Sequence, residues 1–153
     1  MKKLLWVLLF STTLNFANNH LSKWAEFRIA EMFHHPQESS LQSFFTSDAW
    51  NLYQTKFLDT IISPVTEGTQ VTVTLQKFIS PVKITPSQNG QYVQSTFLIK
   101  CSDDIGSWET PVEMILNVVS DNGNYQIESF EGISQSPINV KHFQQDRQAA
   151  CNN

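Results

Sequence analysis

The sequence predicts an α+β domain in which amino-terminal helices pack on one face of a curved antiparallel sheet of four to five strands. Apolar residues recur at steps of three and four up to about residue 62 and alternate with polar residues beyond Gly68. Turn signals join the later segments closely, as in hairpins. With 153 residues, 41% of them hydrophobic and 16% charged, the chain has the material for one core. We therefore expect a single domain.

The first predicted helix covers residues 21–33. Its apolar residues fall on one face of a helical wheel: Leu21, Trp24, Ala25, Ile29, Met32 and Phe33. Pro36 interrupts regular structure, and Ser39 or Ser40 can cap a short helical turn that follows. A second helix is expected from Thr46 or Ser47, with Asp48 in its first turn. One face of this helix is aromatic and aliphatic: Trp50, Tyr53, Phe57 and Ile61.

Extended segments follow Gly68. Val71, Val73 and Leu75 alternate with polar residues, and a second segment is broken by Pro81, which suits a sheet edge or a bulge. Asn89 and Gly90 tolerate positive φ and predict a turn into a long strand over 92–101. The next strand, 112–119, is apolar on both faces and is expected to be central. Residues 121–124 predict another hairpin turn before the last strand, which holds Tyr125 and Ile127.

The amino terminus has the order of residues found in secretory signal peptides. Lys2 and Lys3 precede an apolar run from Leu4 to Phe10, and more polar residues follow. A membrane-spanning helix needs roughly 20 largely apolar residues, which this segment does not supply. We expect residues 1–17 to be a signal peptide that is cleaved after Ala17, which predicts a periplasmic, exported protein. An uncleaved segment would instead associate the chain with the inner membrane.

The remaining residues predict a domain over 18–135 and a flexible, polar tail over 136–153. Without residues 1–17 the chain has eight basic and fourteen acidic side chains, a formal charge of −6. The basic residues are scattered, whereas binding to nucleic acid depends on clustered lysine and arginine. The sequence therefore predicts no nucleic-acid partner and no direct docking on anionic lipid.

The two cysteines, Cys101 and Cys151, can form a disulfide in an oxidising compartment. Closing a loop of about 50 residues would stabilise the fold by about 4 kcal/mol in the chain-entropy model. The alternative is a small buried Cys101 on a strand and a separate thiol near the chain end. Both interpretations stay open at this point.

No residue pattern indicates catalysis, a metal site or a cofactor. The adjacent His34 and His35 project in different directions, and nothing nearby in the sequence completes a ligand set. His20 and His142 are expected to be exposed, and Asp103 and Asp104 are expected to be a solvated loop pair. A buried general base in an apolar cavity would have to be one of three acids: Asp59, Glu113 or Glu128. Their spacing places all three on polar faces.

Trp108 follows Gly106 and Ser107 in a segment predicted to be a polar loop. An aromatic side chain exposed at a loop tip is a candidate contact with a partner protein. The alternative is that Trp108 folds back over the edge of the sheet. The order of elements fits a cone-shaped fold of the cystatin-like or nuclear-transport-factor-like kind, which by itself does not indicate a function.

Over residues 21–133 the sequence resembles the periplasmic domain of the DotI/IcmL family, components of the type IVB (Dot/Icm) secretion system. The segments that carry the resemblance occur in the family's order: Trp24 and Ala25, residues 45–53, residues 81–84, residues 89–92 and residues 112–119. They are packing and turn residues without a catalytic motif. Family members of the usual kind also have an amino-terminal cytoplasmic segment and a membrane-spanning helix. In their place, this sequence has a short signal-like segment.

The resemblance implies a non-enzymatic assembly or scaffold protein that self-associates and contacts other secretion-system proteins. Contact with the membrane would be indirect, through neighbouring subunits or an uncleaved signal segment. The alternative function is a small-molecule-binding or isomerase-like protein of the same cone-shaped fold. A scaffold predicts a filled or dry cone interior and an exposed apolar patch for a partner. A ligand-binding protein predicts an open cavity with a few convergent polar groups.

Overall fold

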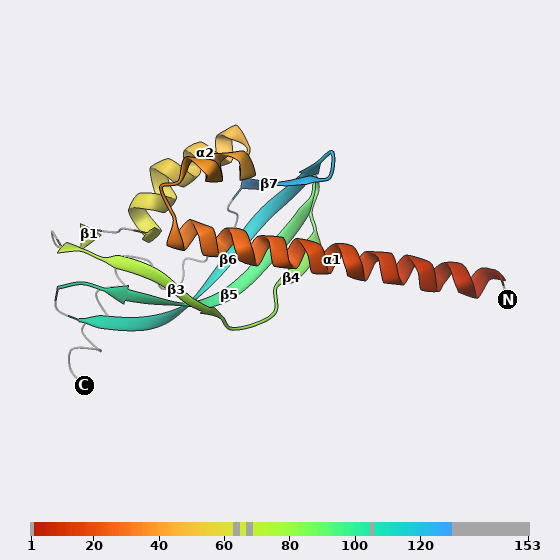
Figure 1. Ribbon diagram of the computed structural model, residues 1–153, viewed down its shortest axis with the longest axis horizontal. Helices are drawn as coiled ribbons and strands as arrows, with labels where there is room; N and C mark the ends of the chain where they lie inside the picture. Colours follow the sequence, from red (N-terminus) through yellow and green to blue (C-terminus); the bar gives the residue numbers. More distant parts are fainter. Residues whose placement is uncertain (1, 63–64, 67–68, 105, 130–153) are drawn as a thin grey trace.

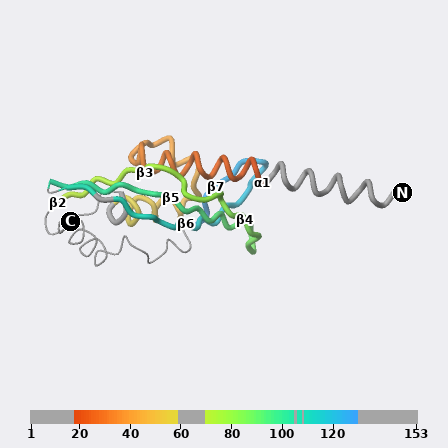
Figure 2. The backbone as a smooth tube through the Cα atoms, turned by 90° about the horizontal axis from the view of Figure 1, so that it is seen from below, coloured from red at the N-terminus to blue at the C-terminus, as the bar shows by residue number. Residues whose placement is uncertain are grey.

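In the computed structural model, a long helix crosses one face of an antiparallel sheet, which confirms the predicted α+β class (Figure 1). The structure describes residues 2–62, 65–66, 69–104 and 106–129, with side chains for 18–58, 70–104, 106–107 and 109–129. The helix, α1 (Lys2–His34), is oblique to the strands, and the second view shows its coloured second half lying against them (Figure 2). Among the described residues, no helix is long and apolar enough to cross a bilayer.

The main sheet has five strands, all antiparallel to their neighbours. They are β3 (Thr72–Phe78), β4 (Lys83–Pro86), β5 (Gln91–Ser102), β6 (Ser107–Asp121) and β7 (Asn124–Ser129). The order is β3-β5-β6-β7, and β4 pairs with the first part of β5. Two short strands, β1 (Val65–Thr66) and β2 (Thr69–Gln70), form a separate pair. The four or five strands predicted from the alternation are therefore confirmed.

Strands β3 and β4 lie along the same edge of β5 and are separated by the segment around Pro81. Phe78 pairs with Phe97, and the ladder resumes when Lys83 pairs with Gln94. Proline lacks an N–H group and disrupts an interior ladder, so it is accommodated at an edge. The predicted edge position of Pro81 is confirmed.

The two predicted turns that contain glycine need this residue for different reasons. Between β6 and β7, Asn122 and Gly123 have φ values of 50° and 83°, as a tight two-residue hairpin requires. At Asn89 and Gly90 the turn is present, but neither residue has positive φ among the described residues. A Cβ atom on Gly90 would lie 2.2 Å from the carbonyl oxygen of Val118. Gly90 therefore permits close contact between two backbones, so the reason given from the sequence was wrong there.

One face of the sheet forms the core. On β5 the buried residues alternate as predicted: Val93, Ser95, Phe97, Ile99 and Cys101. On β6 the buried set is Thr110, Val112, Met114, Leu116 and Val118, together with Asn117. Ile115 and Val119 on the opposite face are only half-buried. Strand β6 pairs with β5 and β7, so the prediction that it is central is confirmed, although the apolar residues on its second face are less buried than those facing the core.

Helix α1 buries the predicted stripe against the sheet, and Leu21, Ala25, Ile29 and Met32 are at most 1% exposed. The short helix η1 (Ser39–Phe44) is a 3₁₀ helix whose N-cap is Glu38, without a side-chain cap from either serine. Helix α2 (Ser47–Leu52) is capped by Thr46, whose Oγ1 accepts from the backbone N–H of Ala49 at 3.4 Å. The next residues form a π-helix, η2 (Tyr53–Ile62), instead of continuing the α-helix.

Aromatic rings fill the space between the helices and the sheet. Tyr53 stacks on Trp50 and on Phe57, each at 5.2 Å between ring centroids. Phe33 meets both Phe57 and Phe97 edge to face. The hydroxyl of Tyr53 donates to the carbonyl of Pro36 at 2.7 Å, and burial raises the pKa of this phenol above its usual value. The rings fix the second helical segment over the sheet.

Candidate functional site

A groove of about 450 Å³ lies outside this core, where α1 and η1 approach the β6–β7 hairpin. Its walls come from these three parts of the chain: His20, Trp24 and Arg28; Ser43 and Phe44; Gly123, Asn124, Tyr125 and Gln126. The three residues of α1 are spaced four apart, so they share one face of the helix. This stripe lies directly beside the buried stripe that packs on the sheet. The groove is therefore built on the same helix turns that form the core.

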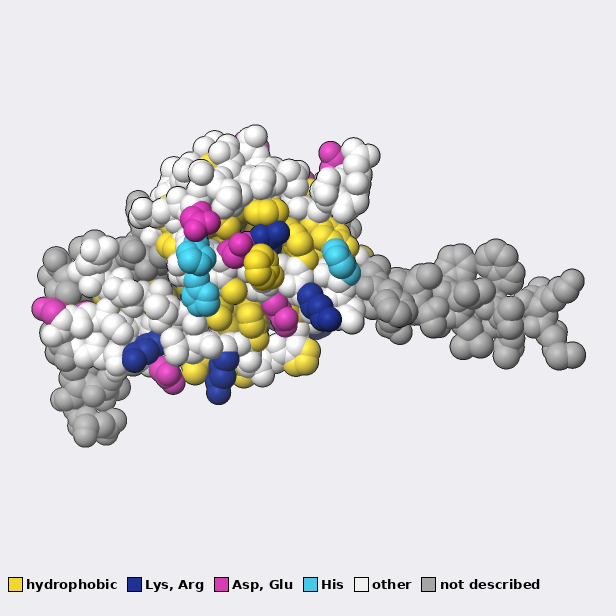
Figure 3. All heavy atoms as spheres, in the orientation of Figure 1, with side chains coloured by type: hydrophobic (Ala, Val, Ile, Leu, Met, Phe, Trp, Pro, Cys, Tyr) yellow, Lys and Arg dark blue, Asp and Glu magenta, His cyan; other side chains and the backbone are white. Residues whose placement is uncertain are grey.

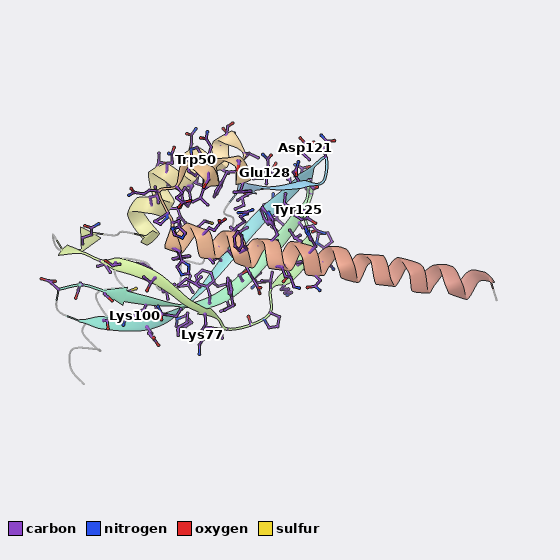
Figure 4. The ribbon with its side chains drawn as sticks, viewed as in Figure 1. Trp50, Lys77, Lys100, Asp121, Tyr125 and Glu128 are labelled. Atoms are coloured by element: carbon purple, nitrogen blue, oxygen red, sulfur yellow. The ribbon has the colours of Figure 1, made fainter. Side chains whose placement is uncertain are left out.

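The hairpin closes one side of the groove through Tyr125. Its ring lies 5.4 Å from the Trp24 ring and 5.8 Å from the His20 ring, measured between centroids. Figure 4 shows Tyr125 on β7 beside α1. The backbone N–H of Thr46 donates to the carbonyl of Ile127 at 3.0 Å, and Phe45 bridges to the same residue. These main-chain contacts join the end of η1 to β7 and hold the three walls together.

Arg28 lies among the aromatic side chains of the groove. Its guanidinium carbon is 3.3 Å from the centre of the Phe44 ring and 5.0 Å from that of Phe27. Nη1 donates to a carboxylate oxygen of Glu31. Nε is shielded from solvent and has no hydrogen-bond partner among the described residues. The groove thus combines apolar rings with a cation whose donors are only partly used.

Phe27 extends the apolar surface beyond the groove. It is 58% exposed, and Ile79 at the β3 edge is 49% exposed. The space-filling view shows hydrophobic side chains gathered over α1, with basic, acidic and histidine side chains around them (Figure 3). An exposed aromatic ring surrounded by polar groups is typical of a protein-binding surface.

The acids that could have served as a general base do not line the core. Glu113 is half-buried on β6 and pairs in register with Thr96 on the face of the sheet opposite the core. Glu128 accepts from the side-chain amide of Asn117 at 2.7 Å. Ser87 in turn donates to Asn117 at 2.9 Å, so the three residues form a polar cluster that joins β7, β6 and the β4–β5 turn. The side chain of Asp59 lies outside the described residues.

The histidine pair is at the surface, whereas Asp103 of the aspartate pair is half-buried, so the prediction of a solvated pair holds only for Asp104. His34 and His35 are exposed, and His35 Nδ1 lies 3.5 Å from a carboxylate oxygen of Glu38. Asp103 accepts from the backbone N–H of Gly106 within the β5–β6 turn, and Asp104 is exposed. Within the described part of the chain, no three His, Cys, Asp or Glu side chains are grouped as metal ligands would be.

Several predicted site residues are only partly described. Trp108 is in β6, where its backbone pairs with Cys101, so the polar turn is shorter than the sequence suggested. The side chain of Trp108 lies outside the described residues, and its role as a partner contact stays a prediction. Cys101 is buried on β5, but Cys151 lies in the undescribed segment. The disulfide, the cleavage after Ala17, the exposure of His142 and the tail over 136–153 also stay predictions.

Sequence reasoning missed the groove. The exposure expected for His20 is confirmed, but Trp24 was assigned to the core, where it is only half-buried, and Arg28 was given no role. The spacing of these three residues was the available signal, because it places a polar and aromatic stripe next to the buried one. Trp24 and Tyr125 are separated by about a hundred residues in the sequence, so their contact could be found only from the fold.

No family model, curated protein or solved structure matches this chain.

Proposed function

We propose that this protein is a non-enzymatic assembly or scaffold protein of the periplasm, similar in role to IcmL-like components of a type IV secretion system. The observation that carries the proposal is the groove on α1, where Trp24, Phe44 and Tyr125 surround Arg28 and the ring of Phe27 is exposed beside them. Aromatic residues and arginine are enriched in the contact centres of protein interfaces. The ordered resemblance to the DotI/IcmL family supports the same function.

The alternative, a small-molecule-binding or isomerase-like protein, has less support. Phe33 packs edge to face against both Phe57 and Phe97 on the core face of the sheet. The described acids Glu113 and Glu128 do not face this core. The volume of the groove does fall within the range for small ligands, so ligand screening is the next step if the test below fails.

The proposal is tested by crosslinking the tagged, full-length protein in its own host, followed by mass spectrometry of the periplasmic and membrane fractions. We expect the secretion-system proteins to be recovered. The variant Phe27→Ser removes an exposed ring beside the groove and should reduce their recovery several-fold. Ile79→Ser is the matched control, because it removes a similarly exposed apolar side chain at the β3 edge. A monomer in the soluble fraction without secretion components would overturn the proposal.

Export is tested separately by the intact mass of the protein purified from the periplasm. Cleavage after Ala17 predicts a chain that begins at Asn18. All groove residues lie after this position, so the mature chain would retain the groove. Recovery of the chain only from the cytoplasm would contradict the proposed location.

A further inference from the structure

The groove differs in charge from the chain that carries it. The chain has fourteen acidic and ten basic side chains, yet the nine residues that line the groove include an arginine and no aspartate or glutamate. Lys23, which precedes Trp24 in the sequence, is exposed on α1 but is not one of the lining residues. Glu31 contacts Arg28 and is the neighbouring acid that partly offsets its charge. An anionic ligand would meet no like charge on the groove walls, which favours its approach.

Arg28 also has unused hydrogen-bond donors. A guanidinium carries five N–H groups in a planar fork. Glu31 accepts from Nη1, whereas Nε has no partner among the described residues. These donors point outward in the plane of the guanidinium, and the Phe44 ring covers one face of that plane. A carboxylate matches such an edge with two oxygens, better than a single carbonyl does.

The other walls favour an apolar side chain next to the carboxylate. The rings of Trp24 and Tyr125 lie 5.4 Å apart and tilted by 59°, and Phe27 adds exposed aromatic surface. Aromatic and large aliphatic side chains gain most from contact with such rings. Asn124 and Gln126 on the hairpin supply amide groups that can bond a peptide backbone.

We propose that the groove binds a peptide segment of a partner protein in which an acidic residue neighbours an aromatic or large aliphatic residue. The carboxylate meets Arg28, and the apolar side chain packs on Trp24 and Tyr125. This inference rests on the proposed protein-binding function and names the chemistry of the partner. The groove differs in this respect from the other described side chains, among which acidic residues outnumber basic ones.

The test uses the full-length protein and an array of terminally blocked peptides that present every ordered pair of amino acids in a Gly-Ser frame. Pairs of Asp or Glu with Phe, Tyr, Trp or Leu should give the strongest signals. By fluorescence anisotropy, a blocked Asp-Phe peptide should bind about tenfold more tightly than the Asn-Phe peptide, since a charged acceptor strengthens the bond to a guanidinium. Equal binding of the two peptides would overturn the inference.

Variants locate the binding. Arg28→Gln should remove the preference for Asp-Phe, whereas Lys100→Gln, which removes a positive charge on β5 outside the groove, should retain it (Figure 4). If Arg28→Gln does not fold, Asn124→Asp serves instead, because it places a negative charge on an exposed part of the groove wall. It should weaken Asp-Phe binding several-fold, and Gln94→Glu on β5 is its matched control. Unchanged binding by the groove variants would contradict the inference.

Two further binding experiments test whether the negative charge comes from a source other than an Asp or Glu side chain. A peptide with a free carboxyl terminus and no acidic side chain tests whether a chain end is recognised in place of Asp or Glu. Vesicles that contain phosphatidylglycerol test for a lipid surface. Preferential binding of either would overturn the inference. If crosslinking recovers secretion components while the groove variants have no effect, the scaffold function stands and only the assignment to this groove fails.

Discussion

The guanidinium of Arg28 stacks on the Phe44 ring, with 3.3 Å between the guanidinium carbon and the ring centroid. This contact joins α1 to η1 at the floor of the groove. A cation over an aromatic face contributes between about 0.5 and 2 kcal/mol, and more when water is excluded. Arg28 is mostly buried, with 16% of its side chain exposed.

A double-mutant cycle of Arg28→Met and Phe44→Leu should therefore give a coupling free energy of about 1 kcal/mol in urea unfolding. A cycle of Lys100→Met with Phe44→Leu should give no coupling, because Lys100 is on β5 away from the groove. Additive effects in the first cycle would show that the Arg28–Phe44 contact does not stabilise the fold.

Gly90 provides a test of backbone proximity. Gly90→Ala would place a Cβ atom 2.2 Å from the Val118 carbonyl oxygen, so β6 or the β4–β5 turn must shift. We expect a loss of about 2 kcal/mol or more in the free energy of unfolding. Gly106→Ala is the control, since a Cβ there meets no atom within 4 Å. Similar stabilities for the two variants would be inconsistent with the close approach of these backbones.

Tyr53 provides a test at alkaline pH. Burial raises the pKa of its phenol, so the folded state holds this proton more tightly than the unfolded state does. The contribution of this bound proton to the free energy of unfolding is fully present below the unfolded-state pKa of about 10. It is lost as the pH rises above that value. Tyr53→Phe should make the alkaline loss of stability less steep.

At neutral pH the same variant should lower the free energy of unfolding by about 1 kcal/mol, because the hydrogen bond to Pro36 is lost. Chemical denaturation at pH 7 and at pH values above 10 measures both effects. A parallel pH dependence in wild type and variant would argue against a selective effect of Tyr53.

Asn117 tests the polar cluster on the sheet. It is 7% exposed and donates to Glu128, so Asn117→Asp would place a second carboxylate against the first. We expect a loss of about 2 kcal/mol at pH 7. The carboxyl pair would bind a proton more tightly when folded, so part of the loss should be recovered as the pH falls towards 4. Asn89→Asp in the exposed turn should show neither effect, and a pH-independent loss in Asn117→Asp would argue against carboxylate repulsion.

The fold class could be predicted because it follows from local periodicity. The α1 stripe at Leu21, Ala25 and Ile29 and the buried face of β5 were both visible as spacing in the sequence. The capping role of Thr46 and the turn at Asn122 and Gly123 were also local, because each depends on a side chain or φ angle within a few residues.

The groove could not be predicted in the same way. Its parts are separated in the chain: Trp24 and Arg28 on α1, Phe44 on η1 and Tyr125 on β7. Helical spacing shows that the first two share a face, but not which distant segment meets that face. Likewise, Gly90 lies in an ordinary turn sequence. Only the fold shows that the Val118 backbone comes so close that no Cβ atom fits at this position.

The sequence by itself thus determined the order of helical and extended segments and most of the residues that face the core, since these depend on the period of apolar residues along a short segment. The tertiary structure decided that the space between the helices and the sheet is filled by aromatic rings, that Glu113 and Glu128 lie away from it, and that Arg28 lies within an aromatic groove. These features depend on how α1, η1 and the β6–β7 hairpin pack together, and packing joins residues that local periodicity does not relate.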